Sequence, residues 1–251
     1  MPEGLVVEQQ DGVRVVRMQF GRANAMNREM LDALASTLTE GEPRPTVLTG
    51  EGKIFCAGLD LVTLHELGEA ELEEFLTRFS RTMIQVLTTP HPLVAAVNGH
   101  AVAGGCVLAL ACDYRVGVEG EYKIGMNELS HGLPLPAVAN EIPRGALTPQ
   151  TFRTVVMSGV LMEPETARQV GILDMMTDDA ETCVAQACAL ARQQGKSLEA
   201  FAGVKAGVVA PVVNAIKELH EPLDRRFIDI WFSEAATQSR RATIESLTNK
   251  G

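Results

Sequence analysis

Two segments combine glycine with an expected helix start, and both could offer main-chain N–H groups to a ligand. Residues 55–61 read FCAGLDL, and residues 98–106 read NGHAVAGGC. Glycine lets a backbone approach a ligand closely, and the first N–H groups of a helix lack helical acceptors. Such groups stabilise developing negative charge, so the two loops together could form an oxyanion hole without any side chain. On spacing alone, glycine turns used for tight packing explain the pattern more simply.

The other reactive residue types lack partners that would give them a chemical role. Residues 49–53, TGEGK, follow an expected strand but complete neither phosphate-binding glycine motif, so they predict an ordinary strand-exit turn. Cys106 follows the double glycine and is expected to be a small buried core residue. His65, His100 and His131 have no Ser or Cys partner in a nucleophile motif, and each is expected to be structural or at the surface.

The elements that must position these segments alternate between strands and helices in the first two thirds of the chain. An Asp-Gly pair between two runs of β-formers predicts a hairpin, and Asn27 can cap the helix that follows. The expected strands are 5–9, 13–20, 45–49, 93–97 and 115–118. The expected helices are 30–38, 72–87, 104–111, 151–158, 165–170, 180–194, 201–219 and 223–248. This layout predicts an α/β core over residues 1–194 and a helical region over 195–251.

Composition limits the classes of function. The chain has 251 residues, 46% hydrophobic and 22% charged, which suits one large domain with a helical appendage. A net charge of −10 argues against a nucleic-acid partner, and an anionic substrate would need a local basic rim. The most apolar stretch, 101–112, is too short to span a bilayer, so we expect no membrane association.

Cysteine usage and the first residues bear on the compartment. The chain has five cysteines, with no C-x-x-C pair and no histidines at ligand spacing, so neither a disulfide framework nor a metal site is expected. The start, MPEGLVVEQQDG, matches no targeting signal. We therefore expect a reducing, cytoplasmic location.

Three motifs together resemble the crotonase (enoyl-CoA hydratase/isomerase) family in order and spacing. They are FCAGLDL at 55–61, AVNGHAVAGGCVLALACDYRV at 96–116 and IGMNELSHGLPLP at 124–136. The similarity runs from NAMN at 24–27 to the helical tail, and in detail it is greatest to mitochondrial-type Δ3,Δ2-enoyl-CoA isomerases. The resemblance implies an α/β fold, a spiral of ββα turns with C-terminal helices that form a trimer or a dimer of trimers.

The resemblance also implies a set of site residues. Its substrate would be an acyl-CoA thioester whose carbonyl oxygen is held by the N–H groups of Leu59 and Gly104, with no further cofactor and no metal. Other substrate-binding positions carried over from the family are Ala23, Ala57, Gly58, Asp60, Leu61, Val107 and Asn127. Arg22 and Lys53 each flank a family binding loop and are candidates for the coenzyme A phosphates, although either could simply be exposed.

The carboxylates distinguish between activities within this family. Family hydratases carry one glutamate three residues after the oxyanion glycine and a second in the next active-site loop. Here the first position is Val107 and the second is Glu128. Hydration suits paired carboxylates, whereas moving a double bond from C3=C4 to C2=C3 needs one group that removes a proton from C2 and returns it at C4. Leu129 and the prolines after it predict an apolar wall that would raise the pKa of Glu128.

The expected function is therefore isomerisation of 3-enoyl-CoA to trans-2-enoyl-CoA in fatty-acid oxidation, with Glu128 as the acid–base residue. Two alternatives stay open: another activity of the same family, either a hydratase or an acyl-CoA thioester hydrolase, and a catalytically silent protein that binds CoA thioesters. The stripe Phe227, Ile230 and Trp231 could cover an acyl tail, build a subunit interface or pack in the core.

Overall fold

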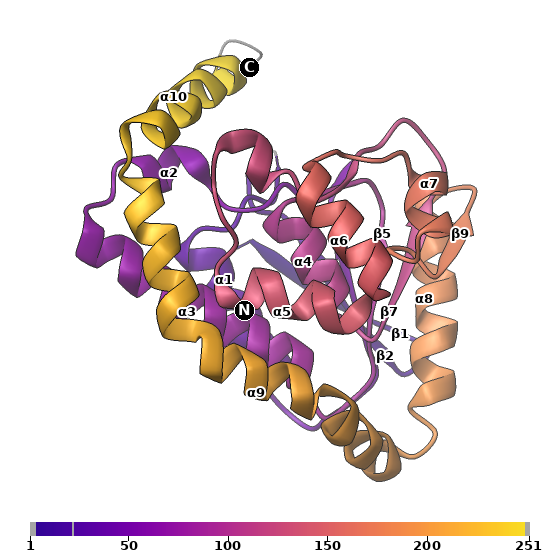
Figure 1. Cartoon of the computed structure of the whole chain (residues 1–251). Coiled ribbons are helices and arrows are strands. Elements are labelled where there is room, and N and C mark those ends of the chain that lie inside the picture. Colours follow the sequence, from indigo (N-terminus) through magenta and orange to yellow (C-terminus); the bar gives the residue numbers. More distant parts are fainter. Residues whose placement is uncertain (1–3, 22, 249–251) are drawn as a thin grey trace.

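The strands form two sheets, and Figure 1 labels five strands of the larger one. The computed structural model describes residues 4–21 and 23–248. The six-stranded sheet has the order β1 (Leu5–Gln10), β2 (Val13–Met18), β3 (Thr46–Gly50), β5 (Leu93–Val97), β7 (Tyr114–Val118) and β9 (Met175–Thr177). The three-stranded sheet has the order β4 (Ile54–Cys56), β6 (His100–Val102) and β8 (Ile124–Gly125). β1 and β2 form the expected antiparallel hairpin, and all other pairs are parallel.

The helices follow the strands in a repeating order. Their bounds are α1 Arg28–Thr39, α2 Leu61–His65, α3 Glu69–Thr88, α4 Gly104–Ala111, α5 Ala137–Ala146, α6 Pro149–Ser158, α7 Pro164–Gln169, α8 Ala180–Gln194, α9 Leu198–Trp231 and α10 Glu234–Thr248, with a 3-10 turn, η1, at Glu128–His131. Each turn of the chain gives one strand to the large sheet, one to the small sheet, and then one or more helices: β3-β4-α2-α3, β5-β6-α4 and β7-β8-η1-α5. This arrangement confirms the expected ββα spiral.

Both faces of the large sheet are covered. In β3, Val47 faces α8 and belongs to a small cluster with Cys183 and Ala187, while Leu48 faces the main core. Figure 1 shows α8 along one side of the sheet, with α4 and α5 on the other. Parallel strands buried on both faces read as continuous apolar runs, which is why 93–97 was recognisable from sequence.

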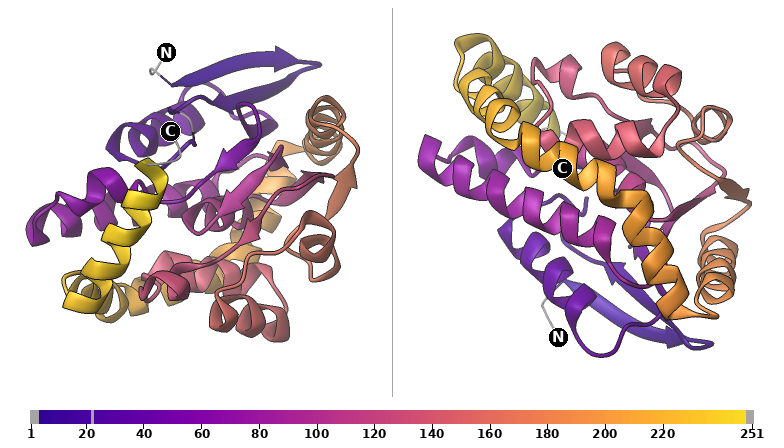
Figure 2. Two further views of the ribbon diagram at one scale, coloured as in Figure 1. Left: turned by 90° about the horizontal axis from the view of Figure 1, so that it is seen from above. Right: turned by 60° about the horizontal axis from the view of Figure 1, so that its bottom comes forward.

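The C-terminal helices differ from the sequence prediction. A break was expected between residues 219 and 223, but α9 continues through Pro211 and Pro222 and ends at Trp231. Pro in a helix interior costs about 3 kcal/mol, and packing of α9 along α3 and α5, visible in Figure 2, offsets that cost. The break lies at residues 232–233, where the Ser233 hydroxyl accepts the N–H of Ala236 and caps α10.

A buried ion pair fastens the start of α9 to the core. Lys205 Nζ lies 2.9 Å from Asp113 Oδ1 and 3.0 Å from Thr89 Oγ1, with both charged side chains largely buried. Asp113 has two further interactions besides this ion pair's shortest contact. Its Oδ2 atom accepts the Leu93 N–H at 2.8 Å and also lies 3.0 Å from Lys205 Nζ, 92 residues away in the sequence.

The opposite face of α9 is apolar and open. Val204 and Val208 are 68% and 70% exposed, whereas Phe227 and Trp231 are buried in the chain's own core. The stripe at 227–231 therefore packs internally, and the open apolar face lies further toward the helix start. Within the described ranges, α9 is also the one helix long and apolar enough to cross a membrane by length and composition; 17% of its most apolar window is buried.

Candidate active site

The two glycine loops identified in the sequence lie against each other. A Cβ added to Gly104 would stand 3.7 Å from the Leu59 nitrogen and 3.5 Å from the Gly58 Cα. The approach depends on β4 and β6 pairing side by side, because Leu59 follows β4 and Gly104 follows β6. The structure thus brings together both N–H groups that were predicted to hold a carbonyl oxygen.

Both of these N–H groups are free. Throughout residues 4–21 and 23–248, neither the Leu59 nor the Gly104 amide donates a hydrogen bond to another protein group. Leu59 forms an isolated parallel bridge with Met26, in which Met26 donates to the Gly58 carbonyl and accepts from the Asp60 amide. The Leu59 N–H consequently points away from Met26. The Gly104 N–H opens α4 and has no helical acceptor.

Ala103 turns the backbone immediately before α4. Its φ of +51° and ψ of −124° lie in a region that non-glycine residues rarely adopt, at a cost of about 1–3 kcal/mol. The Ala103 amide donates to the Gly125 carbonyl at 2.8 Å, which fixes this turn against the loop that leads to Glu128. Strain held by surrounding contacts next to two free N–H groups is typical of a binding site.

Glu128 opens η1 and is half-buried. Its Oε2 atom is inaccessible to solvent and receives no hydrogen bond within the described part of the chain. Burial raises its pKa to about 7. Its charge also contributes to the raised pKa of Cys106 in the first turn of α4, so the carboxylate lies near the start of that helix. A lone carboxylate with this pKa can both accept and return a proton near neutral pH.

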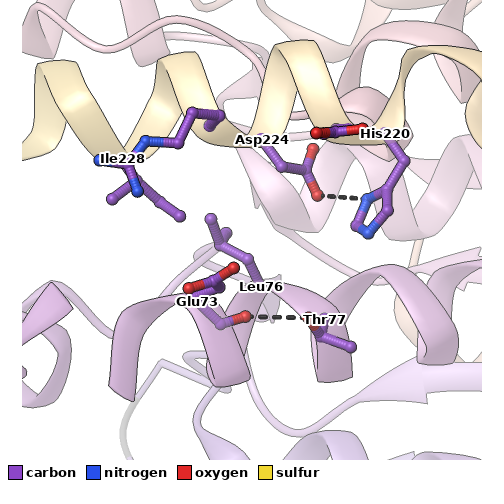
Figure 3. A pocket seen from close by; sticks show the side chains of 8 residues that line it. Glu73, Leu76, Thr77, His220, Asp224 and Ile228 are labelled. Atoms are coloured by element: carbon purple, nitrogen blue, oxygen red, sulfur yellow. Dashed lines mark hydrogen bonds and ion pairs between the residues drawn. The ribbon is translucent and has the colours of Figure 1, made fainter. Parts of the chain in front are cut away.

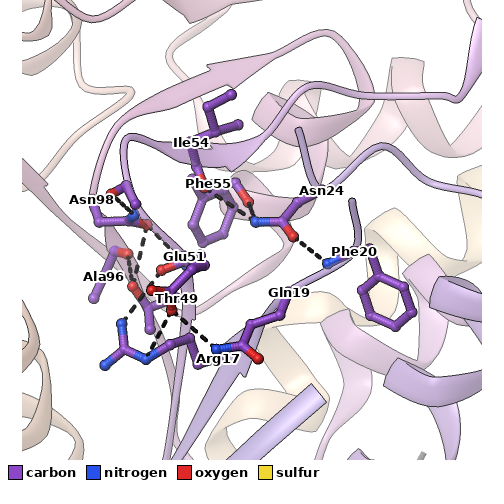
Figure 4. Close-up of polar contacts among 12 residues, drawn as sticks. Arg17, Gln19, Phe20, Asn24, Thr49, Glu51, Ile54, Phe55, Ala96 and Asn98 are labelled. Atoms are coloured by element: carbon purple, nitrogen blue, oxygen red, sulfur yellow. Dashed lines mark hydrogen bonds and ion pairs between the residues drawn. The ribbon is translucent and has the colours of Figure 1, made fainter. Parts of the chain in front are cut away.

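Two buried asparagines hold the loop before Leu59 (Figure 4). Asn98 Oδ1 accepts the Gly50 N–H at 2.8 Å, and its Nδ2 donates to the Gly52 carbonyl at 2.9 Å. Asn24, with φ of +47°, donates from Nδ2 to the carbonyls of Ile54 and Phe55. Residues 49–53 therefore form the expected strand-exit turn. The sequence did not reveal these two roles, although asparagine at a positive φ is a known turn signal.

Several of the other predicted binding residues make hydrogen bonds within the protein. Ala57 donates its N–H to the Ala23 carbonyl at 3.1 Å, so these two positions are adjacent. Asp60 caps α2, its carboxylate accepting the Thr63 amide and hydroxyl at 3.2 and 2.7 Å, and Leu61 begins that helix. The Asp60 side chain thus already has a structural role.

Four further predicted positions remain. Val107 is 0% exposed and lies in the main core cluster, where it packs on its neighbours. Asn127 contacts His131 through its side-chain nitrogen at 3.0 Å. Lys53 is exposed, while Arg22 lies outside the described residues.

The remaining reactive residues behave as structural groups. Burial raises the pKa of the Cys106 thiol to about 12, so it is not a thiolate nucleophile. His100 Nδ1 accepts the Lys123 N–H at 3.0 Å and its ring contacts Tyr122 edge-on. All five cysteines are free and buried. Among the described residues no group of His, Cys, Asp and Glu could hold a metal ion.

A separate cavity lies between α3 and α9 (Figure 3). Its polar centre is the pair His220 Nδ1 and Asp224 Oδ2, 2.8 Å apart. Asp224 also accepts the Ala137 N–H at 2.8 Å and thereby caps α5. This cavity is lined by residues of α3 and α9 and includes none of the loop residues around Glu128. Its polar groups connect helices, which is a structural role.

Comparison with known proteins places the site in a family context. The model of one family, enoyl-CoA hydratase/isomerase, matches residues 8–247. An enoyl-CoA isomerase/hydratase of Mycosarcoma maydis is 33% identical over 182 residues, 72% of this chain and 65% of that protein. The mitochondrial enoyl-CoA delta isomerase 1 of Mus musculus is 31% identical over 169 residues, 65% of this chain and 58% of that protein.

A solved structure agrees with the fold. Human mitochondrial delta3-delta2-enoyl-CoA isomerase superposes with a TM-score of 0.90 at 24% identity, covering 99% of each chain. The fold is thereby confirmed, and the sequence matches confirm the resemblance drawn from the motifs at 55–61, 96–116 and 124–136.

Proposed function

The chain belongs to the enoyl-CoA hydratase/isomerase family, and we propose that it is an isomerase that moves the double bond of 3-enoyl-CoA to give trans-2-enoyl-CoA in fatty-acid oxidation. The observation that carries this proposal is the carboxylate of Glu128, which lies near the start of α4 and has a buried oxygen without a hydrogen-bond partner among the described residues. Glu128 has its pKa raised to about 7, and the position on α4 that carries the second carboxylate in family hydratases is Val107.

The chemistry follows from three groups. The thioester oxygen of the substrate accepts hydrogen bonds from the Leu59 and Gly104 amides. Glu128 removes a proton from C2, and the two amides stabilise the negative charge that develops on the oxygen. Losing one such donor typically costs about 3–4 kcal/mol of transition-state stabilisation. Glu128 then returns the proton at C4, the C2=C3 bond forms and the carbonyl is restored, so no water or cofactor is consumed.

A pKa of about 7 suits both halves of this cycle. The carboxylate must be ionised to accept the C2 proton and, once protonated, must release it to C4. A proton carrier whose pKa lies near the working pH is effective in both directions. Desolvation by the protein supplies that pKa, because burial disfavours the charged form.

The rival activities need features that the chain supports less well. A hydratase must hold water for attack on C3 while it delivers a proton to C2, and Val107 offers that water no acceptor. An acyl-CoA thioester hydrolase likewise needs water at the carbonyl. A silent CoA-thioester-binding protein has no use for an unpartnered buried carboxylate, which lowers stability without contributing to binding.

We further propose an assembly and a location. Exposed Val204 and Val208 on α9 support a homotrimer or dimer of trimers in which a second copy covers this face. Five free, buried cysteines support a reducing, cytoplasmic location. The net charge of −10 argues against nucleic acid, and the packing of α9 on α3 and α5 argues against a place in a membrane. Coenzyme A enters as part of the substrate, and we propose no separate cofactor or metal.

The deciding experiment measures both reactions on one preparation. We expect the protein to isomerise a 3-enoyl-CoA, with the 2-enoyl product detected by a coupled assay. We expect it to hydrate crotonyl-CoA at least about tenfold more slowly, which corresponds to a barrier difference of roughly 1.4 kcal/mol. Comparable efficiencies would overturn the isomerase assignment. Activity on neither substrate would favour the silent binder or another reaction of the family.

A further inference from the structure

His131, at the end of η1, connects the Glu128 loop to α10. Its Nε2 lies 3.0 Å from Asn127 Nδ2, and its Nδ1 lies 3.2 Å from Thr243 Oγ1. The Thr243 hydroxyl also donates to the Ser239 carbonyl at 3.1 Å. One ring therefore joins the residue before Glu128 to a helix that starts more than a hundred residues later.

The donors and acceptors in this chain fix the form of the ring. With the Asn127 amide oriented so that Nδ2 faces the ring, Nε2 accepts from Asn127, because an amide nitrogen only donates. The Thr243 proton is used on Ser239, so Nδ1 must carry the proton that Thr243 accepts. His131 is consequently neutral with its proton on Nδ1. Protonation of Nε2 would place two donors face to face and break the contact with Asn127.

The contact between His131 and the Asn127 side-chain nitrogen leaves the Asn127 side-chain oxygen without a partner in the protein. Asn127 Oδ1 and Glu128 Oε2 are both buried, and neither has a hydrogen-bond partner within the described residues. A buried oxygen without a donor costs about 1–3 kcal/mol. Two such oxygens on consecutive side chains point to a place where a bound molecule or a water supplies the missing donors.

We propose that His131 is a positioning residue: by holding Asn127 from one ring nitrogen and α10 from the other, it orders the Glu128 loop for proton transfer only while the ring is neutral. This inference rests on the proposed function, in which Glu128 carries the proton. Burial lowers the pKa of His131 and so favours the neutral ring.

Burial is what lowers the pKa of the ring, and within the described residues the charged groups around it lie on η1, α10 and α6. The hollow beside the ring is lined by Ser130, Ser239, Ala242, Thr243 and Ser246. On the same turn the titratable neighbour is Glu128. On α10, Arg240 stacks on Trp231 at 3.9 Å and donates to its carbonyl, while Arg241 and Glu245 are exposed. On α6, which packs on η1, Arg153 is exposed and lines a different hollow.

The first test compares two variants in the isomerase assay as a function of pH. A Gln side chain can accept from Asn127 and donate to Thr243, but it does not titrate; an Ala side chain can do neither. At pH 8 we expect His131→Ala to lower kcat roughly 10- to 100-fold with a smaller change in KM, and His131→Gln to restore most of it. If Ala keeps the wild-type kcat, or if Gln falls as far as Ala, the proposal is wrong.

The acid limb of the profile gives a second readout. Glu128 must be ionised and His131 neutral, so as pH falls through the lowered pKa of His131 the wild-type log(kcat/KM) should steepen from a one-proton to a two-proton dependence. His131→Gln should retain a one-proton dependence. Equal slopes in the two proteins would overturn the role of ring protonation.

A third measurement does not depend on activity. The chain has five histidines, so the His131 signals in nitrogen-15 NMR are assigned by their loss in His131→Gln. We expect a protonated Nδ1 and an unprotonated Nε2 at pH 8, and a change at Nδ1 in Thr243→Val. A protonated Nε2 would overturn the proposal. A protein with the expected ring form but no turnover of 3-enoyl-CoA would instead refute the proposed function.

Discussion

Gly58 and Gly104 approach each other so closely that a Cβ on Gly58 would stand 3.1 Å from the Gly104 nitrogen. The same atom would lie 3.0 Å from the Ala103 Cβ and 2.9 Å from the Val102 carbonyl oxygen. Gly58 also has a φ of +89°, which favours glycine. The position therefore requires glycine twice, once for its backbone angle and once for the space beside a proposed oxyanion donor.

Gly58→Ala should consequently reduce turnover by about 10²-fold or more, because the added methyl group displaces the Gly104 amide from the carbonyl oxygen. The matched control is Gly52→Ala. Gly52 also has a positive φ, +63°, but nothing lies within 4 Å of its added Cβ. Both variants should lose stability, and only the first should lose kcat. Urea unfolding first shows that both variants are folded. If Gly58→Ala and Gly52→Ala then have equal kcat values, the close approach of Gly58 to Gly104 does not serve the reaction.

Glu128→Gln keeps the shape of the side chain and removes its basicity. We expect kcat for 3-enoyl-CoA to fall roughly 10²–10⁴-fold while an acyl-CoA ligand still binds, as measured by calorimetry. Glu121→Gln, at an exposed carboxylate, is the control for the loss of one negative charge. Near-native turnover in Glu128→Gln would require another residue to carry the proton.

The sequence predicted the fold where patterns are long and local. Strands such as 93–97 and helices such as 180–194 carry clear apolar patterns, and the structure has both. The strands of the small sheet have two or three residues each, too few to show any period. A helix end was expected between residues 219 and 223, but packing of α9 on α3 and α5 outweighs the hydrogen bond that Pro222 cannot make.

In the candidate site, too, the sequence did not predict the contacts between residues that are far apart in the chain. The two N–H groups and Glu128 were assigned by carrying over family positions through three short motifs, since spacing alone favoured glycine turns used for packing. The contacts that support them connect distant residues: Asn98 with Gly50, and His131 with Thr243, 112 residues apart. His131 was expected to be structural or at the surface, and only its neighbour on α10 distinguishes it from any other half-buried histidine.

The open face of α9 gives a prediction about assembly. We expect the wild type to be a trimer or a dimer of trimers by light scattering, and Val208→Glu to dissociate it, because a charge there cannot be buried against a second copy. Met157→Glu on α6 is a matched control, since Met157 is 69% exposed and Val208 is 70% exposed. A wild-type monomer at micromolar concentration, or equal masses for both variants, would contradict an interface on α9.

The raised pKa of Glu128 makes a separate prediction about stability. The carboxyl titrates near 4.5 in the unfolded chain and at about 7 in the folded protein, so between these values the folded state holds a proton that the unfolded state has lost. Stability from this group is therefore fully present below pH 4.5 and declines as pH rises toward 7, by up to about 3 kcal/mol.

The Glu128→Gln side chain does not titrate, so the free energy of unfolding of this variant should not show that decline. Urea unfolding at pH 5 and pH 8.5 measures this difference. Relative to the wild type, the free energy of unfolding of Glu128→Gln should be about 3 kcal/mol higher at pH 8.5 than at pH 5. Asp113 and Asp224, whose pKa values burial also raises, are common to both proteins and cancel in the comparison. A stability difference that is the same at both pH values would mean that Glu128 is not held in an environment that opposes its charge.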